Sequence, residues 1–112
     1  MAVVARSFLR GDVCLIQLDP TRGSEIRKTR PCVVISPDEL NQHLRTLVVA
    51  PMTTGRHDYP WRVACRFQNR NGMVAIDQLR TIDVERIAKK LGRINPNTML
   101  SVLRVLQEMF SL

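Results

Sequence analysis

Residues 23 to 36 read GSEIRKTRPCVVIS, and this stretch joins a cationic loop to an apolar strand. The run 32–35 is fully apolar and mostly β-branched, which predicts a buried strand. Arg30 stands directly before Pro31, and the restriction on a residue before proline holds Arg30 extended. We therefore predict that Arg30 is a cation positioned on a rigid support. The alternative is a solvated basic loop, because runs of charge usually face solvent.

Breaker residues divide the rest of the chain into further short elements. Residues 13–18 begin with a run too continuously apolar to expose both faces, whereas residues 61–67 alternate as a half-buried strand does. Further strands are expected at 46–52, 72–76 and 91–94, and short helical segments at 37–42 and 83–87.

The C-terminal residues predict the clearest helix of the chain. Asn95 can cap this helix, and Pro96 suits its first position. Its apolar residues follow helical spacing and form one stripe: Met99, Val102, Leu103, Leu106, Met109 and Phe110. Short strands followed by one helix predict a mainly β domain over residues 1–112, either a small antiparallel barrel or a twisted sheet. Residues 1–9 are expected to form an extended N-terminal tail.

Composition favours a polyanionic partner. The 112 residues carry 17 Lys and Arg against 10 Asp and Glu, a net charge of +7, and 14 of the cations are Arg. Arginine presents a planar fork of donors that matches phosphate and also stacks on bases. A GC-rich genome, which favours arginine codons, is the competing explanation.

The remaining composition points to a cytoplasmic protein. Cys14, Cys32 and Cys65 have no paired spacing and lie in apolar or alternating runs, so three buried, reduced thiols are expected. We expect no metal site, no signal peptide and no membrane span. His43 and His57 have no nucleophile nearby and are interpreted as surface residues.

Polar groups at the ends of two other predicted strands complete a candidate site. Thr53 and Thr54 end one strand, where a hydroxyl can donate to a phosphate oxygen, although a capping or turn role explains them equally well. The next strand runs into Asp77, Gln78, Leu79 and Arg80, whose polar members can contact base edges or ribose.

Motifs spread over nearly the whole chain carry a resemblance to a known family. They are Arg10-Gly11-Asp12-Val13, Asp19-Pro20-Thr21-Arg22-Gly23-Ser24-Glu25, Arg30-Pro31 with Cys32-Val33-Val34-Ile35-Ser36-Pro37, Pro51-Met52-Thr53-Thr54, Tyr59-Pro60-Trp61, and Asp77-Gln78-Leu79-Arg80-Thr81-Ile82-Asp83. Each motif is weak alone, but their order and spacing are specific. From Arg10 to its end, the chain resembles the MazF/PemK/ChpB group of toxin endoribonucleases.

The resemblance implies an SH3-like barrel of six or seven strands with a C-terminal helix, and a homodimer. It also implies cleavage of single-stranded RNA without metal or other cofactor, which leaves 2′,3′-cyclic phosphate and 5′-hydroxyl ends. A small acidic, MazE-like antitoxin would silence the enzyme.

The resemblance also assigns roles to residues. Arg30, Thr53 and Glu25 fall on positions with catalytic assignments. Asp77 matches an acidic position proposed to act in PemK-like members, which carry an Arg where this chain has Ala75. RNA contacts are expected from Arg27, Lys28, Thr54, Arg56, Asp77, Gln78 and Arg80.

Elementary chemistry divides the catalytic work between these groups. Arginine is a poor general base, because its pKa of about 12.5 or higher lies far from the operating pH. Arg30 is therefore assigned to charge stabilisation, and Glu25 is the better candidate base once residues 23–29 order around the substrate. Two alternatives stay open: a protein-binding toxin on the same barrel, as in the gyrase-poisoning CcdB group, and a plain RNA-binding module.

Overall fold

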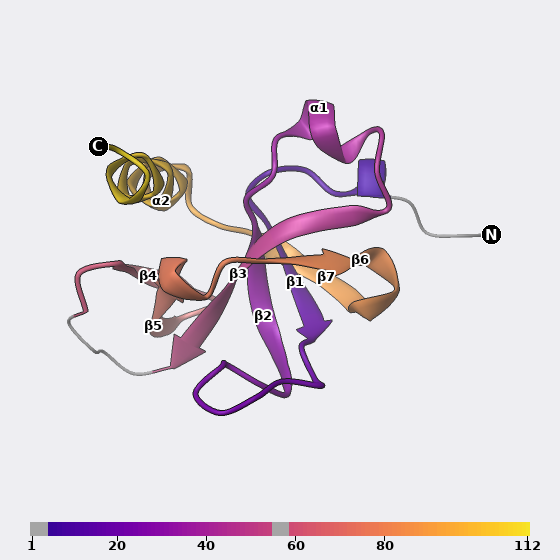
Figure 1. The fold of residues 1–112 in the computed structure, drawn as a ribbon, viewed down its shortest axis with the longest axis horizontal. Helices are drawn as coiled ribbons and strands as arrows, with labels where there is room; N and C mark the ends of the chain where they lie inside the picture. The colour runs from indigo at the N-terminus through magenta and orange to yellow at the C-terminus, as the bar shows by residue number, and fades with distance from the viewer. Residues whose placement is uncertain (1–4, 55–58) are drawn as a thin grey trace.

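An antiparallel sheet with a C-terminal helix beside it makes up most of the chain (Figure 1). This computed structural model describes residues 5–54 and 59–112. The strands are β1 (Asp12–Gln17), β2 (Thr29–Val34), β3 (Thr46–Thr54), β4 (Arg62–Phe67), β5 (Arg70–Ala75), β6 (Arg80–Asp83) and β7 (Ile87–Arg93). The α-helices are α1 (Asp38–Asn41) and α2 (Pro96–Met109), and the 3-10 turns are η1 (Ala5–Ser7), η2 (Ile76–Gln78) and η3 (Val84–Arg86).

The nine-residue strand β3 organises the sheet. The strand order is β4-β5-β3-β2-β1-β7, and β6 also pairs with β3. β3 pairs with β6 through residues 46–49, with β2 through residues 49–51 and with β5 through residues 52–54. β4 and β7 stand at the two ends of this order, and the described residues of these strands do not pair with each other. The fold is therefore an antiparallel sheet, and closure into the expected barrel is not detected.

The apolar run after Arg30 is continuous because β2 is buried on both faces. Side chains alternate across a strand, and Cys32 and Val34 join one core cluster while Val33 and Ile35 join another. The first cluster also contains Phe8, and the second contains apolar residues of α2. Each face of the sheet is thus covered, which anchors the start of β2 on a rigid support.

The structure corrects the predicted N-terminal tail. Ala5 to Ser7 form the 3-10 turn η1, and Ala5 and Phe8 are buried in the first core cluster. The prediction of an extended tail did not consider that Phe8, an isolated aromatic residue, could pack into the core. Residues 1–4 lie outside the described part of the chain.

Most predicted elements are present, with shifted ends. The Asn95 side chain accepts a hydrogen bond from the Asn97 backbone and Pro96 opens α2, as predicted. β2 begins at Thr29, three residues before its apolar run, because residues 29–31 pair with β1. The short strand β6 was missed, since its four residues have no clear alternation of their own.

The three cysteines are free and buried, as expected. Burial raises the pKa of Cys14 to about 11 and that of Cys32 to about 12, so both are neutral thiols near neutral pH. No helix among the described residues is long and apolar enough to cross a membrane.

Candidate active site

Arg30 projects from β2 beside the loop that precedes the strand. Its Nε donates to the Arg27 carbonyl oxygen at 2.9 Å, which turns the guanidinium back over the loop. No other hydrogen bond or ion pair to Arg30 is found within the described residues, so both terminal nitrogens remain available to a ligand. The prediction of a positioned cation therefore has a definite geometry.

Thr53 lies on the adjacent strand, near the end of β3. Its Oγ1 is shielded from solvent and has no hydrogen-bond partner in the described structure. A buried hydroxyl without a partner is uncommon, because it loses its hydrogen bonds to water without replacement. This donor is therefore ready for a ligand atom.

Glycine at position 72 lets β5 approach the Thr53 backbone closely. A Cβ atom built on Gly72 would lie 2.2 Å from the Thr53 carbonyl oxygen. Only glycine tolerates this approach, so Gly72 helps to set the position of Thr53. The sequence marked residue 72 only as the start of a strand.

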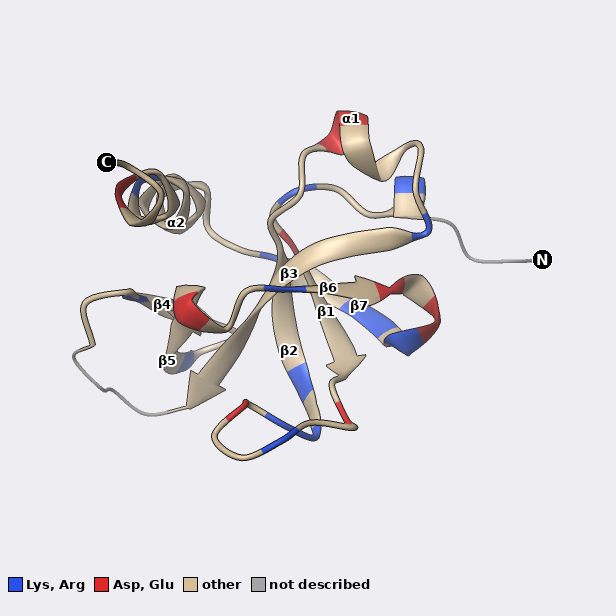
Figure 2. Cartoon of the chain, in the orientation of Figure 1, with Lys and Arg blue, Asp and Glu red and all other residues tan. Residues whose placement is uncertain are grey.

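Arg30 and Thr53 meet in the wall of a hollow of about 360 Å³, which we call the catalytic hollow. Its lining residues come from the loop before β2 and from three strands: Ser24, Glu25, Ile26, Arg27, Arg30, Thr53, Thr54 and Arg62. The structure thus brings together five residues that the sequence singled out, and adds Arg62. Figure 2 shows the basic residues of this loop and of the start of β2 at the end of the sheet where β1 ends and β2 begins.

The loop from residue 18 to residue 28 is held at several points. The Ile26 backbone donates to Gln78 Oε1 at 3.1 Å, and the Arg80 guanidinium donates to the Leu18 carbonyl oxygen at 3.1 Å. Arg86 donates to the carbonyl oxygens of Gln17 and Asp19 at 3.1 and 2.7 Å. Within residues 23–29, which the sequence expected to order around a substrate, Ile26 is thus tied to η2, and the other bonds hold residues 17–19.

These hydrogen bonds give Gln78 and Arg80, two predicted RNA contacts, a structural role as well. Gln78 and Arg80 line an adjoining hollow together with Glu25, Ile26, Pro51, Asp77 and Leu79, but both polar side chains also hold the loop. The Glu25 carboxylate accepts a hydrogen bond from the Arg22 backbone and borders both hollows. Glu25 is thereby fixed beside Arg30 and Thr53.

Arg62 is the residue that sequence reasoning missed. Its Nε and Nη2 donate to the two carboxylate oxygens of Asp77, each at 3.0 Å, and its guanidinium stacks 4.9 Å from the centre of the Tyr59 ring. The hydrogen bond from Arg62 is the largest cause of a lowered Asp77 pKa. Arg62 also pairs in register with Ala75, where PemK-like members carry an Arg.

Two other predicted RNA contacts, Lys28 and Arg56, are not among the described residues that line the catalytic hollow. Lys28 does not line the hollow; its φ of 71° and the bond from its backbone to Asp19 Oδ2 make it a turn residue. Arg56 lies outside the described residues. Within residues 5–54 and 59–112, no three His, Cys, Asp or Glu side chains gather as metal ligands would.

The fold and the site together define a class: a small β domain that presents cations and a free hydroxyl to a shared hollow. A family model described as "PemK-like, MazF-like toxin of type II toxin-antitoxin system" matches residues 9–110. The chain is 36% identical over 90 residues to the endoribonuclease toxin MazF of Escherichia coli K12, a match that covers 80% of this chain and 81% of that protein.

Solved structures agree with this assignment. MazF from Deinococcus radiodurans superposes with a TM-score of 0.82 over 94% of this chain and 97% of that one, at 23% identity, which shows the fold alone. An endoribonuclease bound to its cognate antitoxin, from Mycobacterial species, has a TM-score of 0.76 and 25% identity over 90% of this chain and 92% of that one. The chain belongs to the PemK-like, MazF-like toxins of type II toxin–antitoxin systems.

Proposed function

We propose that this protein cleaves single-stranded RNA by attack of the RNA's own 2′-hydroxyl on the adjacent phosphorus. The observation that carries the proposal is that Arg30 and Thr53 line one hollow, with the Arg30 terminal nitrogens and the Thr53 hydroxyl free of hydrogen-bond partners among the described residues. Family membership and the homologous endoribonuclease MazF support it.

Charge develops on the phosphate as the 2′-oxygen attacks, and donors must meet it. The terminal nitrogens of Arg30 can hold two phosphate oxygens at once, since a guanidinium fork matches this geometry. Thr53 Oγ1 supplies a further donor from β3. Such prepositioned donors stabilise a developing oxyanion without having to reorganise during the reaction.

The 2′-hydroxyl must lose a proton, and we assign Glu25 as the general base that accepts it. The 2′-hydroxyl gives its proton to the Glu25 carboxylate as the new bond from oxygen to phosphorus forms. The bond from phosphorus to the 5′-oxygen breaks, and the leaving oxygen takes a proton, which we assign to the Arg30 guanidinium. The products are a 2′,3′-cyclic phosphate and a 5′-hydroxyl.

Arg62 supplies a second guanidinium to the same hollow, and Asp77 acts through it. Because both Asp77 oxygens accept from Arg62, the carboxylate fixes the direction of that side chain. We assign Arg62 to phosphate binding and Asp77 to the positioning of Arg62. Arg27 and Thr54 contact the RNA backbone, and Arg80 and Gln78 act mainly by holding the loop.

Two protein partners belong to the proposal. A net charge of +7 favours a small acidic antitoxin, and the mycobacterial relative was solved with its antitoxin.

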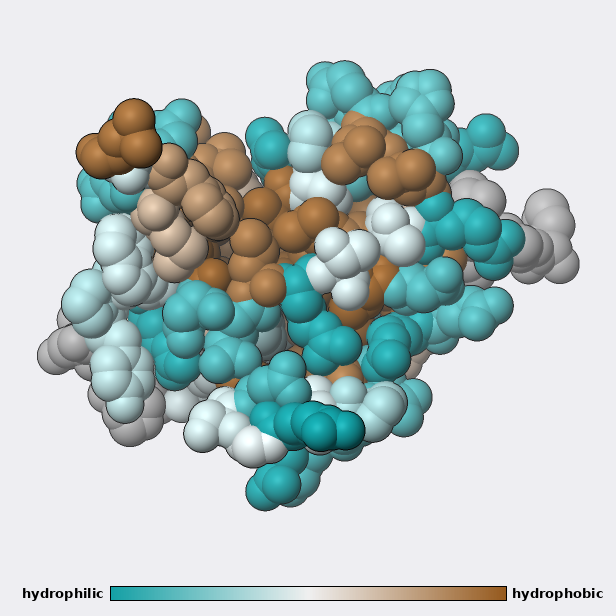
Figure 3. Space-filling view, in the orientation of Figure 1, coloured by the Kyte–Doolittle hydropathy of each residue, from teal (hydrophilic) through white to brown (hydrophobic). Residues whose placement is uncertain are grey.

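The second partner is another copy of this chain, and such a homodimer carries a net charge of 2 × 7 = +14. Figure 3 shows apolar side chains gathered between the two helices on one face, and a second copy would remove such a surface from water.

The decisive experiment incubates the purified protein with a long RNA in excess EDTA and maps the cut ends. We expect cuts in single-stranded regions, cyclic phosphate ends and little cleavage of duplex RNA. Cleavage that requires added Mg²⁺, or ends that carry a 3′-hydroxyl, would contradict the mechanism. Absence of cleavage alongside tight binding would favour an RNA-binding module.

A further inference from the structure

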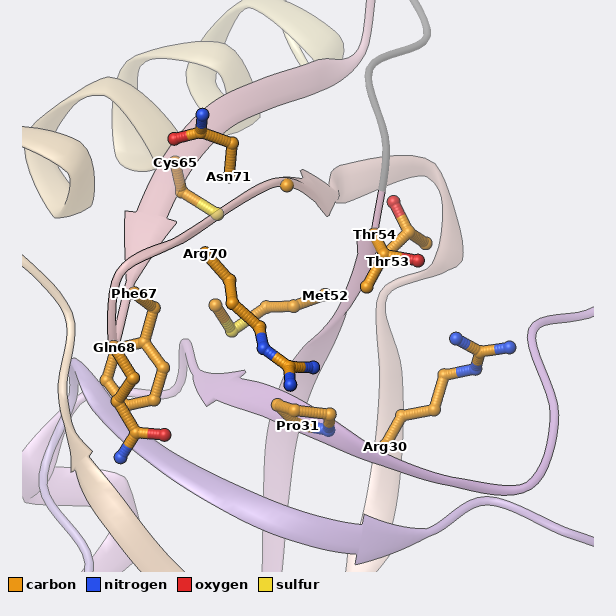
Figure 4. Close-up of a pocket in the computed structure, with 11 residues that line it drawn as sticks. Arg30, Pro31, Met52, Thr53, Thr54, Cys65, Phe67, Gln68, Arg70 and Asn71 are labelled. Carbon is orange, nitrogen blue, oxygen red and sulfur yellow. The ribbon is translucent and has the colours of Figure 1, made fainter.

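A second hollow, of about 450 Å³, adjoins the catalytic hollow and shares Arg30, Thr53 and Thr54 with it (Figure 4). We call it the hairpin hollow, because its far side is the hairpin of β4 and β5. A volume of this size falls in the range of pockets that hold small organic ligands. Any RNA whose phosphate contacts Arg30 and Thr53 must therefore place a neighbouring nucleotide beside this space.

One part of the wall of the hairpin hollow is apolar. Pro31, Met52, Cys65 and Phe67 all line it, and Phe67 also packs against Gly92 of β7. Phosphate groups do not favour such walls, because charge loses hydration there. The faces of a nucleobase do suit them, since bases stack on aromatic and apolar side chains.

A second cation, besides Arg30, lines this hollow. Figure 4 shows the Arg70 side chain extending from β5 with its guanidinium directed into the hollow towards Pro31. Arg70 makes no hydrogen bond or ion pair with any described residue. Its donors, unlike those of Arg62, Arg80 and Arg86, have no task within the described structure.

The hairpin that carries Arg70 is held firmly. Gln68 and Asn69 form its two-residue turn with φ values of 49° and 63°, as a tight hairpin of this type requires. The Gln68 side chain donates to the Leu91 carbonyl oxygen at 3.2 Å, which ties the turn to β7. Arg70 therefore stands on a fixed support, as a residue that discriminates between ligands must.

We infer that the hairpin hollow binds the base next to the scissile phosphate, and that Arg70 determines which base is preferred. The inference rests on the proposed RNA cleavage. A guanidinium pairs best with a base edge that offers two acceptors, and the O6 and N7 atoms of guanine are the commonest such partner. Arg70 would then select sequence, whereas Arg30 and Thr53 act on a phosphate that every nucleotide has.

The test compares cut-site preferences among the wild type, Arg70→Ala, Arg70→Lys and the control Arg66→Ala. Arg66 lies in the same hairpin, is exposed and lies outside the lining of the hollow, so its loss removes the same charge. Each protein is given a pool of random single-stranded RNA, and all cut ends are sequenced. A parallel selection for binding uses the same pool with 2′-deoxy nucleotides, which cannot be cleaved.

We expect both Arg70 variants to lose preference at one position beside the cut, with cleavage of the preferred sequence falling roughly 10- to 100-fold. Other sequences should change little, and Arg66→Ala should keep the wild-type preference. Equal loss on all sequences in Arg70→Ala and Arg66→Ala, with Arg70→Lys like the wild type, would overturn the inference and leave Arg70 a backbone contact.

The binding selection separates this inference from the proposed function. If the wild type does not cut RNA but selects a base in an Arg70-dependent way, RNA cleavage fails and the base site stands. If the wild type cuts RNA with a preference that neither Arg70 variant alters, the base site fails and RNA cleavage stands. Neither cutting nor selection by the wild type would overturn both.

Discussion

Arg62 and Asp77, fifteen residues apart, join in a bidentate ion pair at the rim of the catalytic hollow. β4 and β5 place Arg62 directly across from Ala75, two residues before Asp77. Arg62 therefore lies on the neighbouring strand, across from the position where the resemblance to PemK-like members would place an arginine. The side chain of Arg62 is only 14% exposed and that of Asp77 is 37% exposed, so the pair is partly shielded.

Asp77→Asn removes one charge of this pair while keeping the side-chain size. Because Asp77 is partly exposed, we expect the free energy of unfolding at pH 7 to fall by no more than about 1 kcal/mol. The Asp77 pKa is lowered in the folded protein, so this contribution is present above the ordinary value, about 3.9, and is lost as pH falls through the lower folded value.

Urea unfolding of both proteins between pH 7 and pH 3 measures this difference. Wild type and Asp77→Asn should converge towards the acid end, while the exposed control Glu39→Gln should track the wild type throughout. A difference that persists unchanged at the lowest pH would mean that the ion pair is not its cause.

Arg30→Lys keeps the charge of Arg30 but removes the planar fork. If Arg30 holds the phosphate through two donors in the transition state, single-turnover cleavage should fall by roughly 10²–10³, the usual loss for one such donor. Affinity for an RNA with a 2′-deoxy block at the cut site should change by less than about tenfold.

Arg27→Lys is the matched control, since Arg27 borders the same hollow and is assigned to backbone attraction alone. Its cleavage rate should stay close to that of the wild type. Equal, small losses in both variants would make Arg30 one more surface cation, as the solvated-loop interpretation holds.

Thr53→Val replaces the unpartnered hydroxyl with a methyl group of similar size. The folded protein loses no internal hydrogen bond, so thermal unfolding should show stability unchanged or slightly raised. Cleavage should fall by roughly 10²-fold, because a donor to the developing charge is lost. Thr46→Val, at the other end of β3, should leave the rate unchanged, and a Thr53→Val enzyme of normal rate would remove Thr53 from the mechanism.

Gly72→Ala would push a methyl group against the Thr53 carbonyl oxygen, which as a backbone atom cannot easily give way. We expect a loss of about 1–3 kcal/mol in the free energy of unfolding, typical of overpacking. At temperatures where the variant stays folded, the Thr53 amide resonance should shift and cleavage should slow. An unshifted resonance with a normal rate would show that β5 can retreat without disturbing Thr53.

The sequence by itself determined features that depend on neighbours along the chain. Proline after Arg30 and the buried run beyond it predicted a positioned cation, and the Asn95 cap with Pro96 located the start of α2. These patterns are local because backbone restriction, capping and side-chain periodicity act over a few residues. The end of a predicted strand pointed to Thr53 and the family motifs added Glu25, and both line one hollow with Arg30 in the structure.

Only the tertiary structure decided which arginines are free and which are engaged. The sequence singled out Arg80 as an RNA contact and passed over Arg62 and Arg70. In the structure Arg80 donates to the Leu18 carbonyl oxygen, Arg62 pairs with Asp77, and Arg70 points into a hollow. These fates depend on strand register and on the approach of segments up to 62 residues apart. A one-residue change of register would reverse the face of every side chain on a strand, so the pairing of the strands decides which arginines meet a partner.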